Sequence, residues 1–266
     1  MNWEKWIYSL EDKFGIINNN GMENKMNQYV NPGIEKGEIM NNTIIELQDV
    51  KKIYKMDGVE TPALRGVDLR INKGEFVAIM GPSGSGKSTL LHMVGALDRP
   101  TSGKVFLDGV DISTLKESEL ARLRGRKIGI VFQFFNLHPT LTALENIELP
   151  MIVIEKDKKE RQQRALQLLR AVGLEHRAHH LPSQLSGGEQ QRIAIARALA
   201  NEPEIILADE LTGNLDTKTK AEIMDFLLKL QKEKKMTVTV ITHEPEIAQY
   251  AETIIHIVDG RIKVGG

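Results

Sequence analysis

Alternating apolar and polar side chains mark the start of the regularly patterned part of the chain, at Thr43. Residues 43–50 and 63–71 alternate with a period of two, which predicts strands with one buried face. Residues 76–80 and 204–209 are instead short apolar runs, typical of strands that are covered on both faces. Further strands are predicted at 104–109, 128–133 and 237–242.

Segments with helical periodicity separate these strands. Strands that alternate with helices indicate an α/β core whose sheet is mainly parallel. The last patterned segment, 254–264, predicts a hairpin with Asp259 and Gly260 at its turn. No internal repeat is visible, so the chain carries one copy of this unit. The predicted helices are 87–97, about 116–126, several within 141–200, and 218–233.

The bulk composition narrows the classes of function. The chain has 266 residues, and its 35 basic and 36 acidic side chains give a formal net charge of −1. This balance argues against a nucleic-acid partner, although a local phosphate site needs no net charge. The absence of cysteine excludes disulfides, thiolate metal sites and cysteine catalysis. No apolar stretch approaches the ~18 residues of a membrane span, so we expect a cytosolic chain that reaches a membrane through a partner.

A glycine-rich segment lies between the strand at 76–80 and the helix that follows it. It reads GPSGSGKST and fits the pattern G-x-x-x-x-G-K-[ST] in the strand–helix context that this pattern requires. Glycines let backbone N–H groups turn toward phosphate oxygens, and the helix start adds a favourable dipole. Lys87 is expected to reach the β- and γ-phosphates, and the Ser88 hydroxyl to ligate Mg²⁺. The predicted nucleotide-binding residues here are Gly81, Pro82, Ser83, Gly84, Ser85, Gly86, Lys87, Ser88 and Thr89.

The apolar strand at 204–209 ends in two acids. Asp209 is placed to hold the shell of a Mg²⁺ ion, and Glu210 to polarise an attacking water. Two surface acids at a strand end are common, but four apolar residues lead into this pair and a phosphate loop lies upstream. The two motifs together predict a protein that binds a nucleoside triphosphate, without fixing what the nucleotide drives.

A second glycine pair begins a predicted helix in the segment LSGGEQQ, residues 185–191. It is either an unrelated turn or half of a site that one chain cannot complete. Together with GPSGSGKST, ILADE, NLD and TH, in this order, it makes the chain resemble the nucleotide-binding subunit of an ABC transporter over about residues 43–266. The resemblance implies a P-loop NTPase (RecA-like) core with an N-terminal antiparallel β subdomain. It also implies an α-helical subdomain inserted at about 134–200.

In the family that the chain resembles, two cassettes meet head to tail. Each ATP then lies between the phosphate loop of one cassette and the signature segment of the other. The resemblance implies that Ser186 and Gly188 contact the γ-phosphate of ATP held by a partner, most simply a second copy of the chain. Gly187, between them, is also a predicted nucleotide-binding residue. The physical reason is that exposed N–H groups and a helix dipole attract a phosphate, and glycine allows a close approach.

Further roles follow from the resemblance, one position at a time. Gln133 matches the glutamine that senses Mg²⁺ and water and links hydrolysis to the membrane subunit. His243 matches the histidine that contacts the γ-phosphate, although a lone histidine is more often structural. Tyr54 matches the aromatic residue that stacks on adenine, with a tyrosine packed on a strand as the alternative, and Asp216 matches a loop that crosses the dimer interface. The implied catalytic residues are Glu210, His243, Lys87 and Gln133, and the implied metal ligands are Ser88, Gln133 and Asp209.

The chain departs from the family pattern at two positions. The family usually has proline after the catalytic glutamate, whereas this chain has Leu211. Replacing proline restores an N–H and frees the backbone torsion, so we expect Glu210 to be held less rigidly, with an effect on rate and not on role. Glu244 follows His243 where an aspartate is common, and we expect little consequence.

Two longer segments, 61–105 and 135–151, resemble the lipoprotein-releasing and macrolide-export group of the family. That resemblance implies a permease with few transmembrane helices and a large extracytoplasmic domain, with this chain peripheral on the inner face of the membrane. Residues 134–150 are the expected docking surface. A DNA-acting relative would need a long coiled-coil insertion and a translation-factor relative two cassettes, and neither is present. A subunit that regulates a membrane-bound cell-envelope enzyme without moving cargo stays as the alternative.

The resemblance leaves residues 1–42 as an N-terminal extension. Trp3, Trp6 and Leu10 belong to a set of apolar residues at helical spacing, which is consistent with an amphipathic segment on a membrane or partner. The favoured interpretation is initiation at or near Met40, because residues 36–38 are compatible with a purine-rich ribosome-binding sequence. Asparagine at 18–20 also suits a disordered tail better than a folded one.

Overall fold

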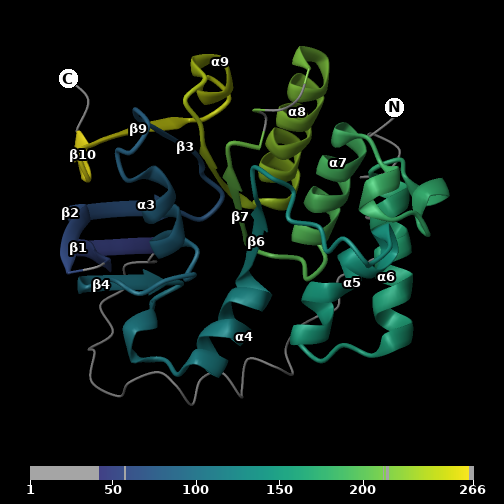
Figure 1. The fold of residues 1–266 in the computed structure, drawn as a ribbon, viewed down its shortest axis with the longest axis horizontal. Helices are drawn as coiled ribbons and strands as arrows, with labels where there is room; N and C mark the ends of the chain where they lie inside the picture. Colours follow the sequence, from purple (N-terminus) through teal and green to yellow (C-terminus); the bar gives the residue numbers. More distant parts are fainter. Residues whose placement is uncertain (1–41, 57, 212, 214–215, 264–266) are drawn as a thin grey trace. The chain divides into compact units, whose positions relative to one another are not determined.

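The computed structural model describes residues 42–56, 58–211, 213 and 216–263, and its elements are labelled in Figure 1. The chain divides into two units, Met1–Asn42 and Thr43–Gly266, and the second is described below. Both interpretations of the N-terminal extension, the amphipathic segment and the start at Met40, lie outside the described residues. No helix in the described part is long and apolar enough to cross a membrane.

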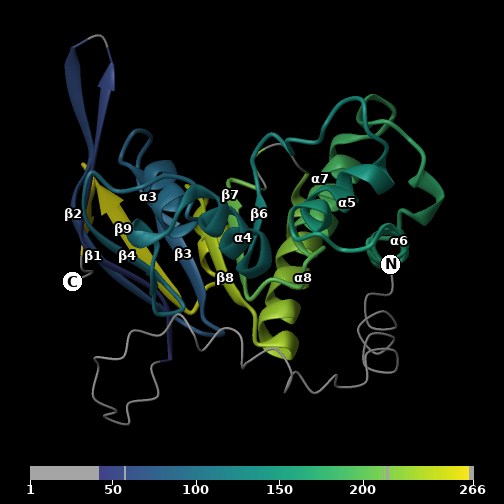
Figure 2. The same ribbon diagram turned by 90° about the horizontal axis from the view of Figure 1, so that it is seen from below.

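An antiparallel sheet is built on a hairpin of two long strands, β1 (Thr43–Met56) and β2 (Val59–Asn72). The sheet continues with β4 (Ser102–Leu107) and the short β5 (Val110–Asp111), in the order β2-β1-β4-β5. The strands predicted at the start of the chain are confirmed, but the hairpin is longer than predicted. The outer part of the hairpin, from the pair Lys51–Arg65 to the pair Met56–Val59, extends beyond the rest of the sheet, as Figure 2 shows. Both faces of this outer part meet solvent, so it lacks the one-sided burial that produces a clear alternation.

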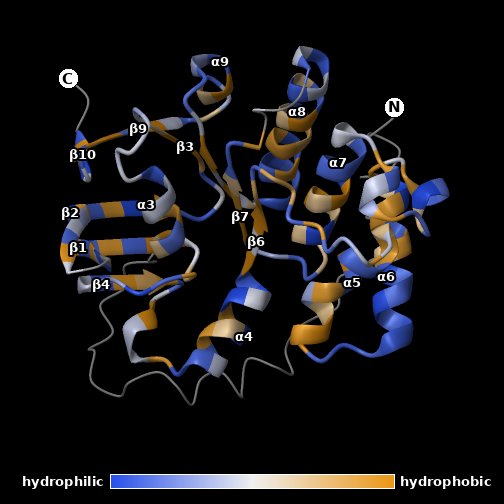
Figure 3. Ribbon diagram, in the orientation of Figure 1, coloured by the Kyte–Doolittle hydropathy of each residue, from blue (hydrophilic) through white to orange (hydrophobic). Residues whose placement is uncertain are grey.

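The second sheet has the order β10-β9-β3-β8-β7-β6, and all neighbours are parallel except the last hairpin. Its central strands are buried along nearly their whole length, and they are among the most hydrophobic segments in Figure 3. This arrangement confirms the predicted α/β core with a mainly parallel sheet. Its strands are β3 (Phe76–Met80), β6 (Ile128–Val131), β7 (Ile205–Asp209), β8 (Thr237–Ile241), β9 (Thr253–Val258) and β10 (Arg261–Lys263).

The hairpin of β9 and β10 confirms the predicted turn at Asp259 and Gly260. Both residues have positive φ, 49° and 72°. A two-residue hairpin turn whose twist matches that of its strands needs positive φ at both positions, which an Asp-Gly pair provides.

Seven helices of the described chain connect and cover the sheets. The first, α3, ends at Val94, three residues before the predicted end, because Gly95 caps it and Ala96 takes a left-handed φ of 50°. The four-residue α9 was too short to give a periodic signal. The helices are α3 (Lys87–Val94), α4 (Glu117–Lys127), α5 (Ala143–Val153), α6 (Lys158–Ala171), α7 (Gly187–Ala198), α8 (Thr217–Lys234) and α9 (Pro245–Ala248). Short 3₁₀ turns occur at Ile112–Thr114, Glu175–Arg177 and Pro182–Gln184.

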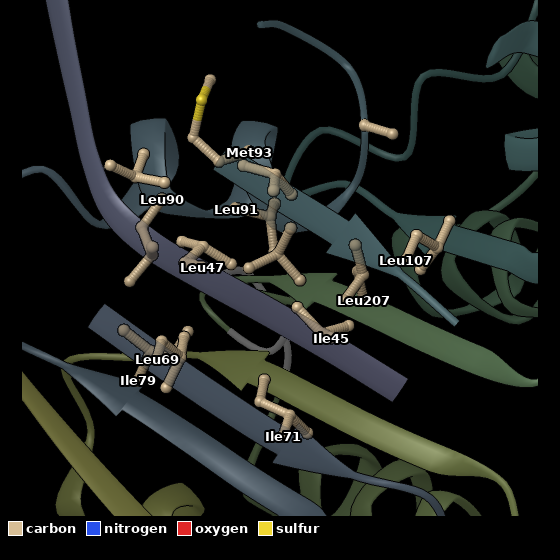
Figure 4. Packing of buried hydrophobic residues seen from close by; sticks show 14 of the residues in the cluster. Ile45, Leu47, Leu69, Ile71, Ile79, Leu90, Leu91, Met93, Leu107 and Leu207 are labelled. Atoms are coloured by element: carbon tan, nitrogen blue, oxygen red, sulfur yellow. The ribbon is translucent and has the colours of Figure 1, made fainter. Parts of the chain in front are cut away.

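A single hydrophobic cluster joins the two sheets through α3. Leu90 and Leu91 are fully buried and belong to the same cluster as Ile45 of β1 and Ile79 of β3, as Figure 4 shows. Burying a leucine side chain stabilises the fold by about 1.5–3 kcal/mol, so this packing fixes α3 firmly. The loop that precedes α3 is therefore held at a defined place between the two sheets.

Candidate functional site

The loop between β3 and α3 can be built only from glycine at its critical positions. Gly84 and Gly86 have φ of 75° and 104°, in the left-handed region. A Cβ atom on Gly81 would lie 2.2 Å from the carbonyl oxygen of Ile257, and one on Gly86 would lie 2.7 Å from that of Ala63. The backbone of β9 and that of β2 thus press on the loop from the two sheets.

The turn between β9 and β10 also supports this loop. The N–H of Gly260 donates to the carbonyl of Ser85 at 2.9 Å, and the N–H of Arg65 donates to the carbonyl of Gly260 at 2.9 Å. A Cβ atom on Gly260 would lie 2.6 Å from the carbonyl oxygen of Ala63. The sequence predicted the turn but gave no sign that it contacts the loop.

The polar groups of the loop suit a phosphate. The Lys87 ammonium is buried and donates to the carbonyls of Gly81 and Pro82, each at 2.8 Å. The Ser85 hydroxyl oxygen is buried and has no hydrogen-bond partner among the described residues, while the Ser88 side chain at the helix start is exposed. A buried, unpaired hydroxyl beside a lysine and a helix N-terminus fits an anion that accepts several hydrogen bonds.

Asp209 is the last residue of β7, at the carboxyl edge of the parallel sheet, and Glu210 follows it. Burial, together with the charge of Glu210, raises the pKa of Asp209 above its ordinary value, with Lys87 and His92 acting in the opposite direction. Glu210 takes a left-handed φ of 43°, and its N–H donates to the carbonyl of Ile241 at 3.0 Å. This hydrogen bond joins the residue after β7 to the last residue of β8, beside the two acids.

Two predicted catalytic side chains, Gln133 and His243, meet a third, Glu210. Gln133, which follows β6, donates through Nε2 to Glu210 Oε2 at 3.1 Å. His243, which follows β8, places its Nδ1 3.3 Å from Glu210 Oε1. The loops after adjacent parallel strands meet at one edge of the sheet, which explains how residues far apart in sequence converge. A carboxylate held on both oxygens is well placed to orient a water and to accept its proton.

Leu211, which stands where the family usually has proline, is packed in a way that the sequence did not show. Its side chain is buried, with 4% exposed, so this position packs into the core. The carbonyl of Glu210 accepts a hydrogen bond from the N–H of Gly213 at 3.1 Å, in addition to the bonds described above. Glu210 thus has hydrogen-bond partners for its side chain, its N–H and its carbonyl. A less rigid Glu210, with an effect on rate, stays a prediction.

The buried acid Asp209 allows a prediction about stability. An acid whose folded pKa is raised binds protons more tightly when folded, so its ionised form opposes folding at neutral pH. We expect Asp209→Asn to raise the midpoint of thermal unfolding at pH 7 by about 2–4 °C, the shift that about 1 kcal/mol produces in a domain of this size. This gain should shrink as the pH falls through the acid range, because Asp209 is then protonated in both states.

The measurement is thermal unfolding without nucleotide at several pH values, with Asp225→Asn as the control. Nucleotide hydrolysis should fall in Asp209→Asn while stability rises. A decrease in unfolding temperature at neutral pH would contradict the stated cause of the shift.

The signature segment begins α7 and lies apart from the phosphate loop of the same chain. In Figures 1 and 2 the parallel sheet separates α7 from α3. Ser186 is the N-cap of α7, and its hydroxyl oxygen accepts the N–H of Glu189 at 3.3 Å. Ser186 and Gly187 are exposed and Gly188 is half-buried. The structure therefore does not bring the two glycine motifs of one chain together.

The two remaining predicted residues, Tyr54 and Asp216, lie on β1 and at the start of α8. Tyr54 is on β1, with its hydroxyl 3.5 Å from Asp98 Oδ2 and the Lys52 ammonium 5.2 Å from its ring centre. Asp216 is the N-cap of α8 and accepts a hydrogen bond from the N–H of Thr219 at 3.0 Å. The hydrogen bonds from the Thr219 side chain and backbone lower the pKa of Asp216. Adenine stacking by Tyr54 and an interface role for Asp216 stay predictions.

A glycine loop between a parallel strand and a helix, with an acid pair at the end of a neighbouring strand, defines a P-loop nucleoside triphosphatase. Residues 64–213 match the family model described as ABC transporter. The chain belongs to the ABC transporter ATP-binding family, and it is an ATPase that binds ATP.

Relatives in three organisms support this assignment. An uncharacterized ABC transporter ATP-binding protein of Thermotoga maritima is 56% identical over 83% of this chain and 94% of its own length. The lipoprotein-releasing system ATP-binding protein LolD 2 of Caulobacter vibrioides is 44% identical over 85% of this chain and 99% of its own length, which confirms the resemblance to that group. The dimeric post-hydrolysis structure of the cassette MJ0796, bound to ADP and Pi, superimposes with a TM-score of 0.78. The sequence of that cassette is 51% identical to this chain, and the match covers 83% of this chain and 97% of the cassette. A relative named MJ0796 comes from Methanocaldococcus jannaschii.

Proposed function

We propose that this chain is the ATP-hydrolysing subunit of an ABC transporter that works as a homodimer with two shared ATP sites. The observation that carries the proposal is the glycine pair at the start of α7. A Cβ atom on Gly187 would approach only Phe135, at 3.9 Å, and one on Gly188 only Thr219, at 3.9 Å. These are ordinary contacts, and neither residue has a positive φ.

Nothing among the described residues therefore requires glycine at these two positions. This contrasts with Gly81 and Gly86, where a Cβ atom would collide with backbone. A surface that is kept free of side chains at a helix N-terminus is suited to the close approach of an anionic group from another molecule. The phosphate end of ATP bound in a second copy is such a group, and the related cassette MJ0796 forms a dimer.

In the proposed mechanism each residue acts from the position described above. The loop N–H groups and Lys87 bind the phosphates, and Glu210 orients a water and accepts its proton. Gln133 and His243 hold the Glu210 carboxylate. Ser88, Gln133 and Asp209 would hold Mg²⁺, and their hydroxyl, amide and carboxylate oxygens are the ligand types that this ion prefers. When bound, the ion neutralises charge on the phosphates.

The proposed docking surface for a membrane subunit lies next to Gln133. A hollow of about 260 Å³ is lined by residues of α4, β6, α5 and α7, among them Pro150 and Val153 of α5, and by Phe132, which follows β6. Phe134, Ile152 and Val153 are large apolar residues with 73%, 50% and 52% of their surface exposed. Of these three residues Val153 also lines the hollow. Exposed apolar residues beside a hollow favour an interaction site, so we extend the predicted surface 134–150 to residue 153.

The partner would be an integral permease, and the chain would be cytoplasmic, peripheral on the inner face of the cell membrane. The similarity to a lipoprotein-releasing ATP-binding protein favours export or lipoprotein release as the process. Regulation of a membrane-bound cell-envelope enzyme stays as the second candidate. The identity of the co-purifying membrane protein discriminates between these two.

Substitutions on the docking surface test the proposed partner. Phe134→Asp and Val153→Asp place a charge on this apolar surface, so we expect each to lower co-purification of the membrane subunit at least about tenfold, the effect of 1.4 kcal/mol. Ile254→Asp is the control, because Ile254 is also apolar and exposed (44%) but lies on β9. ATP binding should be unchanged in all three variants. Equal recovery of the membrane subunit with all three would place the partner elsewhere.

A further inference from the structure

A negatively charged side chain lies at the helix start that the proposed function assigns to a phosphate. Glu189, in the first turn of α7, accepts the N–H of Ser186 at 2.8 Å through Oε2. The hydrogen bond from the Ser186 N–H is the main cause of a lowered pKa of Glu189, so the group is ionised at neutral pH. Such a carboxylate fixes the helix cap, but it also repels an approaching phosphate.

Arg177 lies on the other oxygen of this carboxylate. Its Nε donates to Glu189 Oε1 at 3.1 Å, and its Nη1 lies 3.1 Å from Nε2 of His180. The side chains of Arg177 and Glu189 are 35% and 21% exposed, so the pair is partly shielded from solvent. The two carboxylate oxygens of Glu189 thus have different partners: Oε2 accepts the backbone N–H of Ser186, and Oε1 accepts the Arg177 guanidinium.

The segment that carries Arg177 is itself tied to the helical layer. The N–H of Ala143, at the start of α5, donates to the carbonyl of His180 at 2.8 Å, and the N–H of Leu144 donates to that of Ala178 at 3.0 Å. Arg177 therefore approaches Glu189 from a backbone that is fixed independently of α7. This is the arrangement expected of a residue that orients another.

We propose that Arg177 is a positioning residue for the shared ATP site, holding Glu189 and neutralising its charge so that the start of α7 can receive the phosphate of ATP bound in the partner. The inference rests on the proposed function, since it needs ATP to lie between two copies. It makes Arg177 act through Glu189 and not by contact with nucleotide. The charge on Glu189 is then harmful without Arg177, and removing that charge should remove the need for Arg177.

The test measures the ATP-dependent dimer in a Glu210→Gln background by analytical ultracentrifugation at saturating ATP. Arg177→Gln, which keeps length but loses charge, should raise the dissociation constant about tenfold for each site, equivalent to 1.4 kcal/mol per site. Adding Glu189→Gln, whose amide oxygen still accepts the Ser186 N–H, should restore most of the affinity. Arg177→Lys should keep most of it as well, because the positive charge is retained.

Two controls separate positioning from a general loss of structure. Arg170→Gln removes an arginine from another surface ion pair, with Glu175 at 2.7 Å, and should leave the dimer unchanged. ATP affinity of the monomers and their unfolding temperatures should match those of the parent. An Arg177→Gln chain that dimerises like the parent, or a defect that persists in the double variant, overturns the inference. A Glu210→Gln parent that never dimerises with ATP overturns the proposed function and this inference with it.

Discussion

Glu210→Gln is expected to lower steady-state ATP hydrolysis by at least about 100-fold while ATP still binds, the size of effect that a general base provides. The substitution keeps the shape of the side chain and an oxygen that can accept the Gln133 Nε2 hydrogen bond, found at 3.1 Å in the structure. An amide, however, cannot take up the proton of an attacking water. The lost rate is thus assigned to chemistry and not to the geometry of the site.

The same substitution should lengthen the life of the ATP-bound dimer. ATP that lies between two chains makes contacts that a monomer cannot offer, so it stabilises the dimer for as long as it is present, and without hydrolysis the γ-phosphate is not removed. Phosphate release and gel filtration with ATP measure the two effects on one preparation. Glu246→Gln is the matched control, because Glu246 is an exposed carboxylate of α9. Normal hydrolysis, or a monomer at saturating ATP, would show that Glu210 is not the base.

Ser186→Arg is expected to abolish ATP-dependent dimerisation and, with it, hydrolysis, while the monomer binds ATP as before. Ser186 is exposed at the start of α7, on the far side of the parallel sheet from α3. The parallel sheet separates this position from the chain's own phosphate loop, and in the proposed dimer an arginine there would occupy the space of the partner's phosphate. Steric exclusion at each of two sites should weaken the dimer by more than about 100-fold, equivalent to 1.4 kcal/mol or more per site.

A mixing experiment shows whether the two motifs act in trans. Lys87→Ala removes the ammonium that the loop carbonyls hold at 2.8 Å, so that chain should lose ATP affinity and stay monomeric. A mixture of Lys87→Ala and Ser186→Arg chains pairs one intact composite site with one that carries both lesions. Partial recovery of hydrolysis in the mixture is the expected result. Reduced ATP affinity of the isolated Ser186→Arg monomer would contradict sharing between chains.

The elements around the glycine loop could be predicted because the pattern of neighbouring residues determines them. The apolar run of β3, the glycine loop and the periodicity of α3 are all set by neighbours in sequence. The convergence on Glu210 was also accessible, since Gln133 and His243 each follow a predicted parallel strand, and such strand ends share one edge of the sheet.

Long-range contacts between loops could not be predicted. Gly260 looked like an ordinary turn residue, and only the folded chain shows that its N–H supports Ser85. No sequence pattern singled out Arg177. The capping-box pattern identifies its partner Glu189 but involves only Ser186 and Glu189, so it does not indicate an arginine contact. The burial of Leu211 was equally hidden, since a single substitution from a family pattern does not show what the new side chain packs against.

The bond between Gly260 and Ser85 has a consequence for biosynthesis. During synthesis the ribosome completes the loop at residues 81–89 well before the turn at residues 259–260. The nascent chain therefore exposes the loop before the Gly260 N–H that binds the Ser85 carbonyl has been made. Strand β9, which lies beside β3 and presses on Gly81, is also delivered late. Contacts between such distant segments form slowly, because a long loop must first close. A growing chain should therefore be unable to hold ATP until this last part of the sheet has been made, which delays nucleotide capture until synthesis of the fold is nearly finished.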